Sequence, residues 1–229
     1  MVGALNNHMI KYIVILCCAT ASLASAQKPF RFYDEKGNDI TGKAIKSKVP
    51  HIIGFGENDS IKFGVSLKRE KVGTLSALQF NKLKEYLELL CGSPIDAGSN
   101  IVVNYISALP KIEEKSKERS KWNMLEFPNT FTNQLRKQAN ARQFWVSSPL
   151  VSNLRFYHGE RIDWLKDEQR IISELFFPYE IPDGSFVLIK PDGSYVYYLG
   201  EHEKMEFWTY VEVFLKGNPN PNVEYRVHK

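Results

Sequence analysis

The clearest alternation of apolar and polar positions lies at residues 60–68, where every second residue from Ile61 to Leu67 is apolar. A period of two predicts a strand with one buried face and one solvated face. Residues 29–42 predict an earlier strand that ends in a turn. The run at 101–106 is continuously apolar and rich in β-formers, which is typical of a strand buried on both faces of a central sheet.

Helical spacing of apolar residues is also present. Residues 76–79, Ser-Ala-Leu-Gln, have the form of a capping box and predict a helix that Gly92 ends. Residues 185–200 predict a hairpin with its turn at 190–193. Three more helices are predicted near residues 130–141, 163–177 and 203–216, and a further strand at 142–149.

The first residues predict an exported protein. Lys11 precedes a short apolar run, and Ala24-Ser25-Ala26 follows it, so residues 1–26 form a signal peptide with cleavage expected before Gln27. Translation from Met9 would give a leader of ordinary length as well. The apolar run is shorter than the roughly 20 residues of a spanning helix, so an uncleaved anchor is disfavoured. A lipoprotein is disfavoured too, because residues 15–18, Ile-Leu-Cys-Cys, lack small residues before the sulfur.

The charge composition of the chain limits the classes of partner that it can bind. The chain has 30 basic and 26 acidic residues, a net charge of +4; loss of Lys11 with the leader leaves 29 against 26, or +3. So small and scattered a charge does not indicate nucleic-acid binding. No segment after the leader is apolar enough to span a membrane, so we expect a periplasmic or extracellular protein. We expect an extension at residues 27–95, a domain at 96–217 and a flexible tail at 218–229.

Cys91 is the single cysteine outside the leader, because Cys17 and Cys18 lie within it. A lone cysteine excludes an internal disulfide framework. Its place between a leucine-rich helix and Gly92 favours a small buried residue over a reactive thiol, since no basic residue is near it in sequence.

The order strand, helix, strand, helix, hairpin, helix from residue 101 to 215 resembles the thioredoxin fold. The local sequence is similar to exported thiol–disulfide oxidoreductases of the thioredoxin-like and peroxiredoxin superfamily. In that family an apolar strand ending Val-Asn-Phe leads to Cys-x-x-Cys, and residues 103–105, Val-Asn-Tyr, match the strand end. Tyr179, residues 185–189, Asp192-Gly193 and Gly200 match the family's hairpin. The resemblance implies an α/β, three-layer sandwich with a central mixed sheet, preceded here by an N-terminal β/α extension.

Both defining motifs of that family are missing. By count, Pro110 takes the place of the first cysteine and Glu113 that of the second, while the family's cis-proline aligns near Gly184, two residues after Pro182. Thiol exchange needs a thiolate, which neither proline nor glutamate supplies. We therefore predict no catalytic residue and no cofactor here, and a ligand or partner surface at Pro110, Glu113, Gly184 and Ser185.

Other chemistry has little support. The histidines outside the leader are widely spaced, which disfavours a zinc site. The glycines of residues 54–56, Gly-Phe-Gly, lack the third glycine and the following helix of a nucleotide loop. Residues 58–60, Asn-Asp-Ser, form a glycosylation sequon, which matters only in a host that modifies such sites. The histidines are His51, His158, His202 and His228.

Three hypotheses follow. The first is an exported, redox-inactive thioredoxin-like protein that acts as a binding or scaffold module with another envelope protein as its partner. The second is a peroxiredoxin-like or other thiol-dependent enzyme that uses Cys91. The third is a structural envelope component that docks through residues 27–95.

Overall fold

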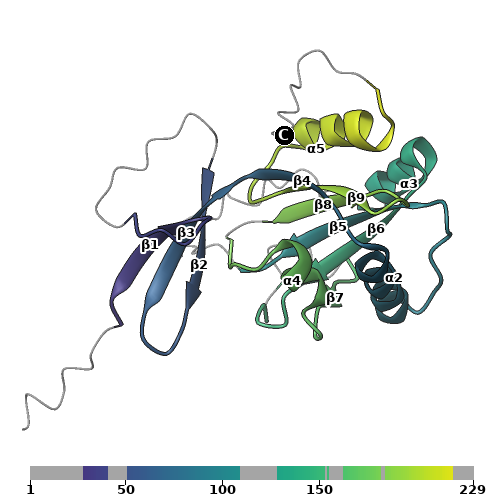
Figure 1. Ribbon diagram of the computed structural model, residues 1–229. Helices are drawn as coiled ribbons and strands as arrows, with labels where there is room; N and C mark the ends of the chain where they lie inside the picture. Colours follow the sequence, from purple (N-terminus) through teal and green to yellow (C-terminus); the bar gives the residue numbers. More distant parts are fainter. Residues whose placement is uncertain are drawn as a thin grey trace, which may run out of the picture.

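The computed structural model describes residues 28–40, 51–108, 128–152, 154, 162–181 and 184–218. Within them a three-stranded sheet stands beside a larger α/β sandwich built on a six-stranded sheet (Figure 1). The elements, in chain order, are β1 Phe30–Asp34, β2 His51–Glu57, β3 Lys62–Lys68, β4 Glu70–Thr74, α2 Ala77–Cys91, β5 Asn100–Ile106, α3 Pro128–Ala139, β6 Ala141–Ser147, β7 Leu165–Lys166, α4 Ile171–Phe176, β8 Ser185–Ile189, β9 Ser194–Tyr198, α5 Lys204–Tyr210 and a π-helical turn Val211–Leu215.

The small sheet has the order β1-β3-β2, with β1 parallel and β2 antiparallel to β3. Sequence reasoning missed β2, because glycine is unfavourable within strands. Its glycines permit close approach here: a Cβ at Gly54 would lie 2.6 Å from Tyr179 Cβ, and one at Gly56 would lie 2.7 Å from the Phe63 ring. Only Arg69 separates β3 from β4, so the chain runs from the small sheet directly into the large one.

The six strands of the large sheet have the order β4-β9-β8-β5-β6-β7. β5 is parallel to β6 and antiparallel to β8. The strand at 101–106 therefore lies directly beside the first strand of the hairpin. β4 and α2, which precede the boundary predicted at residue 95, belong to this sheet and its core. The protein is therefore a mixed α/β structure with two mixed sheets.

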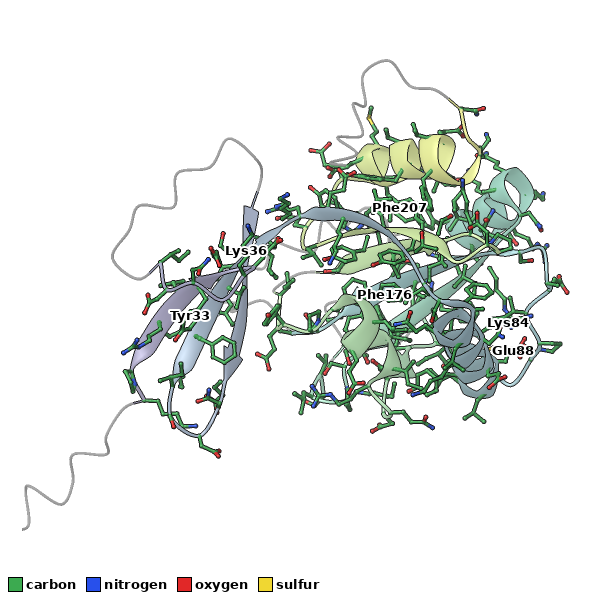
Figure 2. All side chains as sticks on the ribbon, viewed as in Figure 1. Tyr33, Lys36, Lys84, Glu88, Phe176 and Phe207 are labelled. Atoms are coloured by element: carbon green, nitrogen blue, oxygen red, sulfur yellow. The ribbon has the colours of Figure 1, made fainter. Side chains whose placement is uncertain are left out.

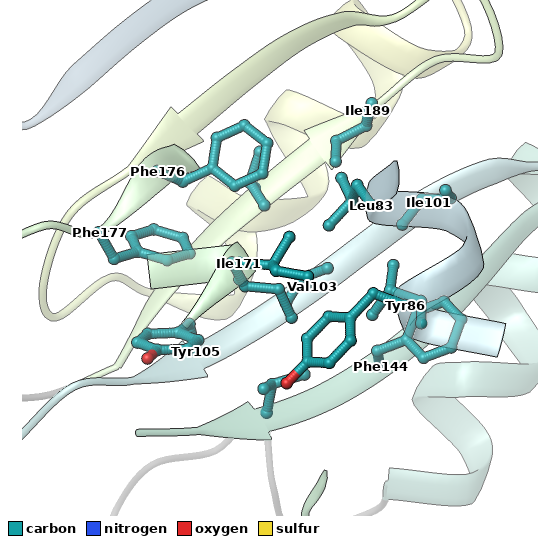
Figure 3. Packing of buried hydrophobic residues seen from close by; sticks show 14 of the residues in the cluster. Leu83, Tyr86, Ile101, Val103, Tyr105, Phe144, Ile171, Phe176, Phe177 and Ile189 are labelled. Carbon is teal, nitrogen blue, oxygen red and sulfur yellow. The ribbon is translucent and has the colours of Figure 1, made fainter. Parts of the chain in front are cut away.

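Helices cover both faces of the large sheet. α2 and α4 bury Leu83 and Phe176 on one face, and α3 and α5 bury Leu135 and Phe207 on the other. In Figure 2 Phe176 and Phe207 approach the sheet from opposite sides, and Figure 3 shows the α2/α4 core in detail. β5 contributes to both cores, because its alternate residues point to opposite faces. Its predicted burial on both faces is confirmed.

The helix ends agree with the sequence in some places and not in others. The Gln79 amide donates to the Ser76 hydroxyl, and Gly92 ends α2 with φ of +67°, as the capping pattern predicts. The helix predicted at 163–177 is wrong in its first half: α4 begins at Ile171, and the strand β7 precedes it. The left-handed backbone of Arg170, with φ of +58°, prevents an earlier helix start.

Candidate functional site

Gly184 and Ser185 lie where β8 begins, opposite the end of β5. Both are buried, and the Ser185 hydroxyl accepts a hydrogen bond of 3.1 Å from the Gly200 amide. They therefore tie β8 to the end of β9 and present no exposed side chain to a partner. The other two predicted site residues, Pro110 and Glu113, lie outside the described residues, so the four cannot be placed together.

His202 lies beside this junction, although sequence reasoning gave it no role. Its Nδ1 is 3.0 Å from the Gly200 carbonyl oxygen. The Phe186 ring packs against it at 4.7 Å between centroids. Burial lowers the pKa of His202 to about 4, because desolvation penalises the imidazolium. The neutral ring thus joins Phe186 of β8 to the backbone that follows β9. Its only sequence signal is a position shortly after the hairpin.

A second polar group lies at the same end of the sheet, where Asp167 is fully buried. Its carboxylate accepts hydrogen bonds from the amides of Ile172 and Ser173 at the start of α4, and from the Tyr105 hydroxyl at 3.4 Å. Burial, with the carboxylate next to it, raises the pKa of Tyr105. The Tyr105 ring stacks on Phe177 (Figure 3). This arrangement holds α4 on the sheet and leaves both groups engaged in structural bonds.

The only thiol outside the predicted leader is at the opposite end of the sheet. Cys91 ends α2, where the sequence predicts a small buried residue, and it is half-buried against the core. Arg142, at the start of β6, places its Nη2 3.2 Å from the Cys91 sulfur. The sequence did not reveal this contact, because the two residues are 51 positions apart. Arg142 lies opposite Ile101 and Ser185 lies opposite Tyr105, so about 13 Å of β5 separates the position beside Cys91 from the start of β8.

The small sheet carries the exposed aromatic side chains. Phe30 and Phe55 are 44% and 39% exposed, and their ring centroids lie 6.3 Å apart. Phe32 extends this group, with its ring 5.0 Å from that of Phe30. We call Phe30, Phe32 and Phe55 the aromatic cluster. Phe30 and Phe55 belong to neither buried core cluster and present an apolar surface to solvent.

The neighbouring positions of the same strands point to the other face of the small sheet. There Tyr33, Phe63 and Tyr179 line an open groove of about 490 Å³ together with polar residues of the turn after β1. Figure 2 shows Tyr33 and Lys36 on this sheet. The Asp34 carboxylate is engaged by the turn itself, and hydrogen bonds from Asn38 lower its pKa. The groove therefore offers aromatic side walls but few free charges.

Within the described ranges, no three histidine, cysteine, aspartate or glutamate side chains gather in a way that could hold a metal ion. In the same residues no helix has the length and apolar character needed to cross a membrane. Comparison with protein-family models, with curated proteins and with solved structures found no match to this chain.

Proposed function

We propose that this chain is an exported, thioredoxin-like binding protein that performs no thiol exchange and docks on another envelope protein through its small sheet. The fold assignment is supported by the order β5, α3, β6, α4, β8, β9, α5 and by the position of β5 beside β8. The helices lie on both faces of the central sheet, as a three-layer sandwich requires.

The position of Cys91 carries the claim that the protein is not a thiol enzyme. Exchange chemistry in thioredoxin-like proteins takes place where the strand equivalent to β5 ends and β8 begins. Cys91 lies at the other end of β5, next to Arg142. The β8 start holds Gly184 and the engaged hydroxyl of Ser185, and neither supplies a nucleophile of the required kind.

Purified protein should therefore neither reduce insulin with dithiothreitol nor consume peroxide above the thiol-only background. Cys91→Ala should behave identically to the parent chain in both assays. Turnover that disappears in Cys91→Ala would overturn the proposal, whereas turnover that survives in that variant would point to a contaminant.

The aromatic cluster supports the choice of docking surface. Aromatic side chains anchor protein interfaces more often than most residue types, and Phe30 and Phe55 present theirs to solvent. The ion pairs of Glu57 with Lys28 and Lys62 lie at the same end of the sheet and form a polar rim. An apolar centre with a polar rim is the usual composition of a protein interface.

A photo-crosslinking residue at Phe30 or Phe55, introduced in the source cells, tests this surface directly. We expect one defined adduct with an envelope protein from either position, and none from Leu89 or Leu150, which are exposed apolar residues of the sandwich. Adducts only from Leu89 or Leu150 would place the interface on the sandwich. The parent chain without the crosslinker controls for non-specific capture.

One observation favours the alternative of a thiol-dependent enzyme. The Arg142 guanidinium lies beside the Cys91 sulfur, and a neighbouring cation is a feature of reactive cysteines. This alternative expects Cys91 to react with iodoacetamide at least tenfold faster than a free cysteine peptide, and Arg142→Leu to remove the difference. A rate equal to that of the peptide would reject it.

A further inference from the structure

We propose that Asn58 is an acceptor site for N-linked glycosylation, with a lipid-linked oligosaccharide as the sugar donor. Residues 58–60, Asn-Asp-Ser, are the only Asn-x-Ser/Thr sequence in the chain with a residue other than proline in the middle. Such transfer occurs on exported chains, which agrees with the predicted leader. The inference shares the predicted export with the proposed function, but no residue of the aromatic cluster is part of the acceptor.

The acceptor occupies an exposed turn between β2 and β3. Asn58, Asp59 and Ser60 are all exposed. In Figure 1 this turn lies at the end of the small sheet that points away from the sandwich. The Asn58 amide donates to the Ile61 carbonyl and closes the turn at 3.0 Å. A glycosyltransferase can therefore approach the asparagine without moving either sheet.

The side chain of Asn58 is also oriented for transfer. Its Oδ1 accepts hydrogen bonds of 2.9 Å from the amides of both Ser60 and Ile61. The carboxamide oxygen is thus fixed against the turn, and the Nδ2 of the same group points away from these two amides. The nitrogen is the atom that must react.

The chemistry is a substitution at the anomeric carbon of the donor sugar. Asn58 Nδ2 forms a bond to that carbon, the bond from the carbon to the lipid pyrophosphate oxygen breaks, and the pyrophosphate leaves with the bonding pair. One Nδ2 proton passes to a base of the transferase. The product keeps the carboxamide oxygen, so both hydrogen bonds that hold it in the turn are retained.

The surroundings of the turn suit a bound sugar. Asn58 lines the open groove of about 490 Å³ on the small sheet, together with the aromatic side chains of Tyr33 and Phe63. The faces of sugar rings carry apolar C–H groups that pack on aromatic side chains. Tyr33 and Phe63 give the first sugar residues such a surface, on the face of the small sheet opposite the aromatic cluster.

The test uses folded, purified protein, a single-subunit oligosaccharyltransferase and a synthetic lipid-linked oligosaccharide, with intact-mass spectrometry as the readout. We expect one added glycan, located at Asn58 by peptide mapping. Ser60→Ala should lower occupancy at least tenfold while leaving the turn intact, because only the backbone amide of Ser60 bonds Asn58. Ser60→Thr should keep occupancy or raise it.

Asn58→Gln should abolish the modification, and its circular dichroism spectrum checks that the chain remains folded. An unrelated sequon peptide, run in parallel, establishes that the transferase is active. An unmodified folded chain in that same experiment would overturn the proposal, as would a glycan mapped to any other residue.

Discussion

All five residues of β8 in the sandwich are buried, whereas none of the five residues of β1 in the small sheet is. Composition explains part of the difference, because β1 contains the charged residues Arg31 and Asp34 whereas β8 contains none. β8 lies between β5 and β9 with helices on both faces, while β1 pairs with β3 and none of the helices that the structure describes packs extensively on it. A three-stranded sheet needs a buried hydrophobic face to be stable alone, and β1 contributes no buried residue, so we expect the small sheet to depend on its junction with the sandwich.

The junction between the small sheet and the sandwich consists of a few residues. The Phe55 and Glu180 backbones exchange two hydrogen bonds, of 2.9 and 3.0 Å. Ile52 and Leu67 extend from the small sheet into the margin of the sandwich core. The comparison therefore separates a self-sufficient sandwich from a sheet whose order depends on a few contacts. Four substitutions or conditions test this distinction.

The largest effect should come from removing a phenylalanine in the sandwich. Phe186 is fully buried and packs against Phe207 and His202. Phe186→Ala should cost about 3–5 kcal/mol of the free energy of unfolding, measured in urea. The matched change Phe30→Ala, at a residue 44% exposed, should cost less than about 1 kcal/mol. Equal losses would show that the small sheet is as integral to stability as the sandwich.

The next test acts on the junction itself. A Cβ at Gly54 would lie 2.6 Å from Tyr179 Cβ and 2.9 Å from Leu67 Cδ1, so Gly54→Ala should destabilise by about 1–3 kcal/mol. Hydrogen exchange should increase in residues 51–68 before it increases in β5 or β8. Gly98→Ala is the control, because no atom lies within 4 Å of its added Cβ. Unchanged exchange in residues 51–68 would contradict the importance of this contact.

Acid should weaken the sandwich through His202. Its pKa is about 4 in the folded chain, against an ordinary value of 6.5, so the unfolded chain binds the proton more readily. The stabilising effect of the neutral ring is complete above pH 6.5 and is lost as the pH falls towards 4. Between pH 8 and 5 the loss is about 2 kcal/mol.

Urea unfolding at several pH values measures this loss, and His202→Gln should flatten the pH dependence over the same range. An identical slope in the parent and the variant would assign the acid sensitivity to other groups. Arg69 is the neighbouring positive charge that also lowers the pKa of His202. Arg69→Gln should therefore raise the folded-state pKa of His202 and reduce the acid-induced loss of stability, by less than His202→Gln does.

The smallest expected effect is a gain in the free energy of unfolding. Arg170 has φ of +58°, in a region that favours glycine, and its side chain is exposed. Arg170→Gly should raise the unfolding free energy by about 1 kcal/mol or less, since relief of the left-handed strain exceeds the entropy cost of glycine. Asn140→Gly is the comparison: Asn140 tolerates this backbone better and also donates to the Gly98 carbonyl. A larger gain at Asn140 than at Arg170 would contradict this account.

Much of the sandwich could be predicted from local sequence. The capping box at Ser76, the apolar run of β5 and the turn ending at Gly193 are local signals, and each element formed where its signal lies. The strands β2 and β4 were missed, because the conformations of Gly54 and Gly73 depend on rings that come from elsewhere in the chain. A Cβ on Gly73 would meet the Tyr195 hydroxyl.

The candidate site was harder to predict because it depends on burial and on distant partners. Counting along the chain identified Gly184 and Ser185, and the structure brings Ser185 into contact with Gly200. No local sequence pattern predicts that Ser185 is buried or that His202 packs beside it. The Arg142–Cys91 contact could not be predicted for the same reason, since it joins two elements that are remote in sequence.

The single residue between β3 and β4 has a mechanical consequence. A partner that pulls on the small sheet would load β3 and, through Arg69, the first residue of β4. β4 is an edge strand held to β9 along its full length, from Glu70 to Thr74. A force along the strand would therefore shear several backbone hydrogen bonds at once instead of opening them one by one. A docked small sheet would transmit tension into the sandwich along the direction in which this edge resists it best.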